Sequence, residues 1–318
     1  MITVATDGTG NFKTVQAAVD SITSGPETIF IKDGIYKERV DIRLDNITLI
    51  GESKDNTIIT YDYYANIIME DGLKRGTFRT STFLVNANNF NNANYFNAYN
   101  ITFINSSGFG TIVGQAIAVY AEGDRITFKN CKMLGHQDTL FTGPLPKKEK
   151  EPGGFRGPTE HADRIPGHQL YEDCYIEGEI DFIFGSAIAY FKNCELYAIN
   201  RDKEINAYYT APSTYEEQKY GYVFESCKFT GNCPDKTVCL SRPWRIYAKA
   251  VFLRCDFSSQ ITDYAFHDWN KPESHDTCYY AEYKCFGKGS NTDNRPSYTH
   301  QLTDEESREY TQEKVIGF

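Results

Sequence analysis

The stretch Phe191-Lys-Asn-Cys194-Glu-Leu196 decides the fold, because its spacing of aromatic, cysteine and apolar residues recurs along the chain. Four other segments have the same spacing: Phe128-Lys-Asn-Cys131-Lys-Met133, Tyr171-Glu-Asp-Cys174-Tyr-Ile176, Phe224-Glu-Ser-Cys227-Lys-Phe229 and Phe252-Leu-Arg-Cys255-Asp-Phe257. A related segment from Phe96 to Phe103 has Asn100 near the cysteine position. The chain therefore contains an internal repeat centred on cysteine.

This repeat has a constant centre and a variable length. Successive repeat cysteines are 43, 20, 33 and 28 residues apart, while the aromatic and apolar residues alternate with polar ones. Such alternation is typical of a β-strand, and unequal steps between similar strands indicate a solenoid whose coils carry loops of different length. A buried cysteine behaves as a small hydrophobic residue. We therefore predict an all-β solenoid in which the five repeat cysteines form an internal column of free thiols.

Both ends of the chain carry signals for short helices. Near the N-terminus, apolar residues at helical spacing predict a helix that covers the first coil; they are Val15, Ala18, Val19 and Ile22. Near the C-terminus, Thr303 followed by Glu306 predicts a capping box that opens a second helix. The proline- and glycine-rich stretch 143–167 is interpreted as one long loop insertion, so we expect a single domain over 1–318.

Composition and charge exclude several classes of partner. The formal net charge is −10, which disfavours binding to nucleic acid. No apolar run approaches the roughly 20 residues that cross a bilayer, so no membrane partner is expected. No signal peptide is visible after Met1, so we expect secretion if a leader is missing from this sequence and a cytoplasmic protein otherwise. We expect a monomer.

Two aspartates occupy equivalent positions in neighbouring repeats. Asp138 lies seven residues after Cys131, and Asp181 lies seven residues after Cys174. If the strands pair in register, the two side chains lie on adjacent coils, whose strands are about 4.8 Å apart. Two carboxylates so close do not both ionise easily, so one pKa is raised and an acid lies beside a base or nucleophile. The alternative is that both are unrelated turn residues.

Five segments carry a more specific signal. They are Gly34-Ile-Tyr36-Lys-Glu38, Gln115-Ala-Ile-Ala-Val119, Gly135-His-Gln137-Asp138-Thr139-Leu140, Asp181-Phe-Ile-Phe-Gly185 and Leu240-Ser-Arg242-Pro243-Trp244. In this order they resemble the signature blocks of the pectin methylesterase family, although Ser241 replaces a usual glycine and His136 a common aromatic residue. The loop 143–167 is more like that of bacterial members. The resemblance covers nearly the whole chain and implies a right-handed parallel β-helix with short capping helices at its ends.

The resemblance also implies a reaction and its residues. It implies a pectinesterase that removes methyl esters from C6 of galacturonate units in pectin, releases methanol and needs no metal or organic cofactor. Asp181 is implied as the nucleophile, Asp138 as the acid and base, and Arg242 as the residue that orients Asp181. Gln115 and Gln137 are implied as donors to the oxyanion.

Three aromatic residues are implied to bind the substrate. They are Trp244, Trp269 and Phe182, and the two tryptophans are expected to be flat platforms for galacturonate rings. The charge of −10 also predicts a preference for highly methylated pectin, because each methyl ester removes one negative charge from the polymer. Arg242 and the lysines of 147–150 are cations that oppose this preference near the cleft.

Three other functions remain open from the sequence. A pectate lyase or polygalacturonase keeps the fold and cleaves the polymer chain. A non-catalytic β-helix binds glycans or is purely structural. A repurposed family member acts on another ester or a thioester.

Overall fold

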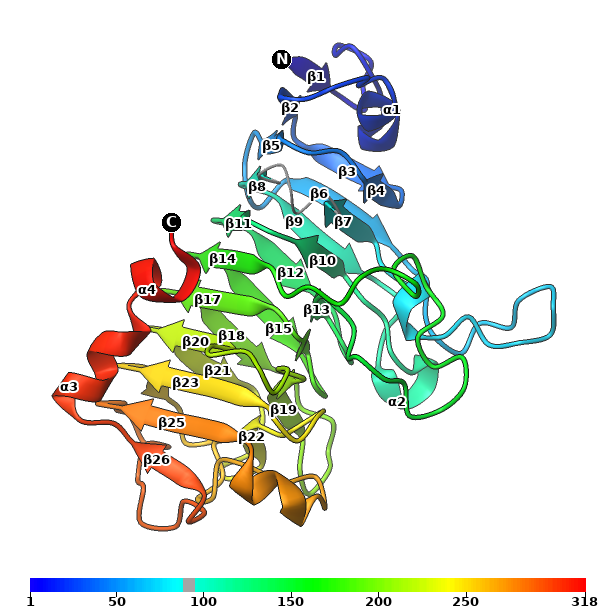
Figure 1. Cartoon of the computed structure of the whole chain (residues 1–318). Helices are drawn as coiled ribbons and strands as arrows, with labels where there is room; N and C mark the ends of the chain where they lie inside the picture. Colours follow the sequence, from blue (N-terminus) through cyan, green and yellow to red (C-terminus); the bar gives the residue numbers. More distant parts are fainter. Residues whose placement is uncertain (88–94) are drawn as a thin grey trace.

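The computed structural model describes residues 1–87 and 95–318, which form a right-handed parallel β-helix built from three sheets (Figure 1). The longest sheet contains β1 (Ile2–Val4), β2 (Glu27–Ile31), β5 (Ile47–Gly51), β8 (Phe96–Tyr99), β11 (Ile126–Lys129), β14 (His168–Glu172), β17 (Ile188–Lys192), β20 (Tyr222–Glu225), β23 (Lys249–Leu253), β25 (Tyr279–Tyr283) and β26 (Thr299–Gln301). The second contains β3 (Gly34–Lys37), β6 (Thr57–Tyr61), β9 (Thr102–Asn105), β12 (Lys132–Leu134), β15 (Tyr175–Gly178), β18 (Glu195–Ala198), β21 (Lys228–Gly231) and β24 (Asp256–Phe257). The third, here called the cleft sheet, contains β4 (Val40–Ile42), β7 (Phe83–Ala87), β10 (Val119–Gly123), β13 (Leu140–Thr142), β16 (Ile183–Gly185), β19 (Ala207–Pro212) and β22 (Val238–Ser241).

Helices are short and lie outside the coils. They are α1 (Val15–Asp20), α2 (Gly110–Val113), α3 (Asp304–Ser307), α4 (Gln312–Ile316) and the 3-10 turns η1 (Thr77–Arg79), η2 (Pro272–Asp276) and η3 (Arg308–Tyr310). Across the residues that the structure describes, no helix has the length and apolar character needed to cross a membrane.

The aromatic residue of each repeat stacks on the next inside the β-helix. Phe128 pairs in register with Tyr171, and Tyr171 pairs with Phe191. Their rings lie nearly parallel, with centroids 5.5 Å and 4.6 Å apart. Burial of one such side chain contributes roughly 1.5–3 kcal/mol, so the repeated ring is a main source of the stability of the coil.

The predicted column of cysteines is confirmed. The five repeat cysteines are free and buried, and they are Cys131, Cys174, Cys194, Cys227 and Cys255. Each thiol donates to a carbonyl oxygen of the previous coil, as the Cys174 Sγ does to Phe128 O at 3.4 Å. Cys285 extends the column by one coil with the same contact, to Phe252 O at 3.4 Å.

A left-handed corner precedes each cysteine. Asn130, Asp173 and Asn193 have φ values of 53°, 54° and 53°, a conformation that asparagine and aspartate tolerate better than most residues. In the related segment 96–103, the cysteine position falls one residue later than the sequence suggested. Asn100, with φ 57°, occupies the corner. Ile101 occupies the cysteine position, as shown by its carbonyl, which accepts a hydrogen bond from the next coil as the cysteine carbonyls do.

The N-terminal helix lies where the sequence predicted. Thr14 caps α1 by accepting from the Ala17 N–H, and the helix buries Val15, Ala18 and Val19 against the first coils. Its apolar stripe therefore closes the N-terminal end of the interior.

The C-terminal helices form as predicted but cover a different surface. Thr303 and Glu306 make the expected capping box of α3. The helices turn back along the outer face of the longest sheet, so that α4 contacts β14 and β17 (Figure 1). The reason is that this face carries apolar side chains such as Tyr190 and Val223, which Val315 and Ile316 bury. The end coil instead holds a buried ion pair between Arg295 Nε and Glu282 Oε1, at 2.8 Å.

Candidate active site

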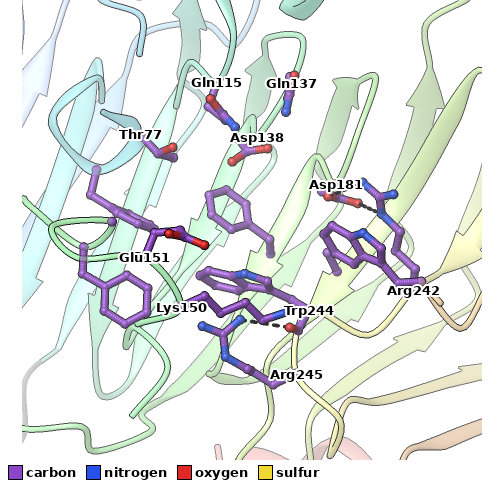
Figure 2. A pocket seen from close by; sticks show the side chains of 16 residues that line it. Thr77, Gln115, Gln137, Asp138, Lys150, Glu151, Asp181, Arg242, Trp244 and Arg245 are labelled. Carbon is purple, nitrogen blue, oxygen red and sulfur yellow. Dashed lines mark hydrogen bonds and ion pairs between the residues drawn. The ribbon is translucent and has the colours of Figure 1, made fainter. Parts of the chain in front are cut away.

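A cleft of roughly 330 Å³ lies beside the cleft sheet and contains most of the predicted site residues. Gln115, Gln137, Asp138, Asp181, Arg242, Trp244 and Trp269 all line it. They come from segments spread over more than 150 residues of sequence, from Gln115 to Trp269, which the stacking of the coils brings together (Figure 2).

The two aspartates occupy equivalent places on neighbouring coils, as the offsets predicted. Leu140 of β13 pairs with Ile183 of β16, so Asp138 and Asp181 each lie two residues before the paired strand positions. The Asp138 N–H donates to Ile180 O at 3.1 Å, which ties the two turns together. Both aspartates have left-handed backbones, with φ 67° and 51°. The shared corner gives the two side chains the same direction, into the cleft.

Arg242 holds Asp181 at both carboxylate oxygens. Its Nε and Nη2 donate to Asp181 Oδ1 and Oδ2, each at 2.7 Å. The guanidinium carbon lies 3.7 Å from the centroid of the Trp269 ring and 3.9 Å from that of Tyr208. Bidentate, charge-assisted hydrogen bonds fix geometry as well as charge, and the flanking rings fix the plane of the donor. These contacts favour the ionised form of Asp181 and fix the orientation of its carboxylate.

The environment separates the two aspartates in acidity. Burial raises the pKa of Asp138 well above its ordinary value, and the charge of Asp181 raises this pKa further. Burial also raises the pKa of Asp181, but the charge and hydrogen bonds of Arg242 oppose that rise. The proton shared by the pair therefore belongs on Asp138 and the negative charge on Asp181.

Two amides extend the cleft beyond Asp138. Gln115 and Gln137 are half-buried, and Figure 2 shows both beside Asp138. The Ala116 N–H donates to Gln137 O at 3.0 Å, so the two segments lie on adjacent coils. Side-chain amides supply N–H donors, which suit an oxyanion that forms next to them.

The tryptophans have different surroundings within the cleft. Trp244 stacks on Phe78 with ring centroids 6.4 Å apart and meets Phe184 edge-on at 5.6 Å. Trp269 covers the guanidinium of Arg242. Both are half-buried and line the cleft, so both can contact a ligand there.

The substrate-binding prediction for Phe182 is wrong. Its side chain is fully buried in the interior of the β-helix, where its ring packs on Tyr209 at 5.3 Å between centroids. The turn at Asp181 directs the next side chain inward, and Phe184, two positions further along the strand, lines the cleft instead. Strand alternation alone would place Phe182 and Phe184 on the same face, so it is the left-handed corner at Asp181, just before β16, that separates them.

Two cleft residues were not predicted from the sequence. Phe78 comes from η1 and Phe155 from the loop 143–167, whose Lys150 lies at the cleft as expected. Only the folding of these segments over the cleft sheet brings them to the site. Arg245 also lines the cleft, where its position directly after Trp244 is the one hint that local sequence offers, and Lys271 lines the adjoining hollow.

Comparison with known sequences agrees with this geometry. The pectinesterase family model matches residues 1–145 and 161–317. Pectinesterase 31 from Arabidopsis thaliana is 31% identical over 99% of this chain and 92% of its own length. A pectinesterase from Petunia integrifolia is 34% identical over 92% of this chain and 72% of its own length.

Solved structures of pectin methylesterases also resemble this chain. Pectin methylesterase PemA from Erwinia chrysanthemi is 30% identical, covers 99% of this chain and 96% of that one, and has a TM-score of 0.79. Pectin methylesterase from carrot is 27% identical, covers 99% of this chain and 93% of that one, and has a TM-score of 0.83. The chain belongs to the pectinesterase family.

Proposed function

We propose that this protein is a pectin methylesterase, which hydrolyses the methyl ester at C6 of galacturonate units and leaves pectate and methanol. The observation that carries the proposal is the pair of aspartates, one held as an anion by Arg242 and the other protonated through burial. Membership of the pectinesterase family supports the same reaction.

The first half of the reaction forms an acyl-enzyme. The carboxylate of Asp181 attacks the C6 carbonyl carbon, and the amides of Gln115 and Gln137 stabilise the negative charge that develops on the carbonyl oxygen. Asp138 donates its proton to the methoxy oxygen as the C–O bond breaks. Methanol leaves, and an anhydride joins Asp181 to the galacturonyl carbon.

The second half restores the enzyme. Asp138, now ionised, takes a proton from water, and the resulting hydroxide attacks the galacturonyl carbon of the anhydride. The bond to Asp181 breaks, the free galacturonate leaves, and Asp138 is protonated again. Throughout the cycle Arg242 keeps the oxygens of Asp181 in position and favours the anion as leaving group.

The cleft also suits a sugar polymer. Trp244 and Trp269 present aromatic faces beside the two aspartates, and such faces pack well against the apolar faces of sugar rings. A solved pectin methylesterase that is 30% identical to this chain is in complex with a hexasaccharide. We infer that methyl-esterified homogalacturonan is the substrate, and that this chain acts as a monomer.

The decisive experiment measures methanol and chain length together. Highly methylated pectin should release methanol while its molar mass, followed by size-exclusion chromatography, falls only by the mass of the lost methyl groups. Chain shortening with no methanol would instead indicate a lyase or glycosidase. Faster release from simple alkyl esters than from pectin would indicate a repurposed esterase.

A further inference from the structure

A second pair of side chains lies beside the two aspartates. His136 lies two residues before Asp138, and Glu179 lies two residues before Asp181, so the second pair also occupies equivalent places on neighbouring coils. The Glu179 N–H donates to His136 O at 2.8 Å. Their side chains also meet, with His136 Nδ1 at 2.8 Å from Glu179 Oε1. The same register that aligns the aspartates therefore builds a histidine–carboxylate contact next to them.

The carboxyl group of Glu179 is fully buried, and this contact offsets the cost of its burial. Among the residues that the structure describes, His136 is the only ion-pair partner of Glu179. A buried carboxylate is strongly destabilising unless it is paired and hydrogen-bonded. A carboxylate can only accept, so the proton of this contact lies on Nδ1 of the imidazole. The pairing therefore fixes both the tautomer and the orientation of His136.

The second oxygen of Glu179 holds the start of α2. Glu179 Oε2 accepts from the Gly110 N–H at 3.2 Å, at the first residue of that short helix. The ring of Phe109, one residue earlier, lies 4.6 Å from the imidazole of His136 between centroids. Both members of the pair thus contact the same two residues that open α2, and they join this segment to the two coils beneath it.

The start of α2 lies directly against the side chain of Gln137. A Cβ added at Gly110 would lie 2.6 Å from Gln137 Cβ and 2.8 Å from Gln137 Oε1, so only glycine permits this approach. Because the amide oxygen faces Gly110, the amide nitrogen is directed away from it, and Gln137 lines the catalytic cleft. A shift at the start of α2 therefore moves a donor of the cleft.

We propose that Glu179 and His136 are positioning residues that hold the amide of Gln137 in place in the cleft, through the start of α2. In the proposed reaction this amide donates to the oxyanion, so the effect on catalysis rests on the proposed function. The family commonly has an aromatic residue in place of His136, and a phenylalanine there has no ring nitrogen to bind Glu179. The pair is thus a particular solution of this chain to the positioning of a shared donor.

The first measurement compares kcat and KM on highly methylated pectin. We expect Glu179→Gln and His136→Phe each to lower kcat by about tenfold to a hundredfold, since a small displacement of a transition-state donor is costly. KM should stay within about twofold, because the donor acts on charge that develops only in the transition state. The matched control is Glu177→Gln, a half-buried carboxylate of β15 that binds the Tyr175 hydroxyl and does not line the cleft. It should keep the kcat of wild type.

The second measurement asks whether the pair acts through Gln137. In a Gln137→Ala background, Glu179→Gln should cause little further loss of kcat, because the donor that it positions is already gone. An equal fold-loss in both backgrounds would overturn the inference. Thermal unfolding establishes that each variant is folded, and His136→Phe replaces Glu179→Gln in this cycle if the latter is not.

A third measurement is independent of activity. In a crystal structure of Glu179→Gln, or of His136→Phe, the side chain of Gln137 should leave its place beside Asp138, whereas in Glu177→Gln it should stay. An unmoved Gln137 would overturn the inference even if wild type releases methanol from pectin. If Gln137 moves but wild type releases no methanol from any methylated pectin, the positioning role stands and the esterase proposal fails.

Discussion

At the level of single residues, the carboxylate of Asp181 accepts both hydrogen bonds of Arg242 and carries the negative charge of the pair. We predict that Asp181→Asn lowers kcat by roughly a thousandfold or more, because an amide is not an anionic nucleophile. Circular dichroism should show an unchanged fold. Retention of more than a few per cent of wild-type kcat, in protein free of deamidation, would place the nucleophile elsewhere.

Arg242 tests the geometry of the same pair. Lysine keeps the charge but loses the two-point contact and the stacking between Tyr208 and Trp269. We expect Arg242→Lys to lower kcat and to move the acidic limb of the kcat/KM profile to higher pH, because Asp181 is then less well stabilised as an anion. Arg245→Lys is the matched control, and an equal shift in both variants would contradict the assigned role of Arg242.

At the level of elements, the cysteine column belongs to the interior and not to the chemistry. Burial raises the pKa of Cys131 to about 12, so its thiol is neutral and unreactive at neutral pH. A thiol reagent should label the half-buried Cys233 and Cys285 first in native protein, and the five repeat cysteines only after unfolding. Rapid labelling of all nine cysteines in native protein, followed by mass spectrometry, would show that the coils open readily.

The loop 143–167 is tethered to the cleft sheet by a buried carboxyl. Glu122 lies within hydrogen-bond distance of Thr159 Oγ1 at 2.7 Å and of the Tyr120 hydroxyl at 3.2 Å. Burial raises the pKa of Glu122 to about 7, from an ordinary value of 4.5. The folded state therefore holds this proton more tightly than the unfolded state. The resulting stability is fully present below pH 4.5 and is lost as pH rises to about 7, by up to about 3 kcal/mol.

Glu122→Gln should remove this dependence, because glutamine does not titrate. Chemical unfolding at pH 5 and at pH 8 measures the free energy of unfolding of wild type and variant. The exposed Glu149→Gln on the same loop is the control and should behave as wild type does. If the free energy of unfolding changes by the same amount between pH 5 and pH 8 in wild type and in Glu122→Gln, the assignment is contradicted.

At the level of the whole molecule, two electrostatic effects of opposite sign act on a low-methyl pectin. The net charge of −10 repels the polymer over the screening length, about 30 Å at 0.01 M salt and 10 Å at 0.1 M. The lysines of 147–150 and Arg245, which line the hollow beside the cleft, attract it at contact. We therefore expect kcat/KM on low-methyl pectin to rise between these two salt concentrations and to fall towards 1 M. A steady fall of kcat/KM from the lowest salt concentration would show that the local cations dominate throughout. The net charge would then be the wrong guide to how this enzyme meets the polymer.

The sequence by itself determined the coil and the aspartate pair. Register in a parallel β-helix follows from counting residues between repeated strands, so equal offsets from Cys131 and Cys174 were enough to align Asp138 with Asp181. The resemblance of Leu240-Ser-Arg242-Pro243-Trp244 to a family block brought Arg242 to the same site. Family membership and all-β architecture were therefore both predictable.

Only the tertiary structure decided what surrounds that pair. Phe78 and Phe155 line the cleft and Lys271 lines the adjoining hollow, although their segments share no common spacing, because loops of different coils fold over one face of the cleft sheet. Phe182 turned inward because the left-handed corner at Asp181 sets the direction of the side chain that follows. Net charge is a sum over the whole chain and says nothing about where each charge lies. The electrostatic field that a carboxylate meets in the cleft depends on the position of each cation.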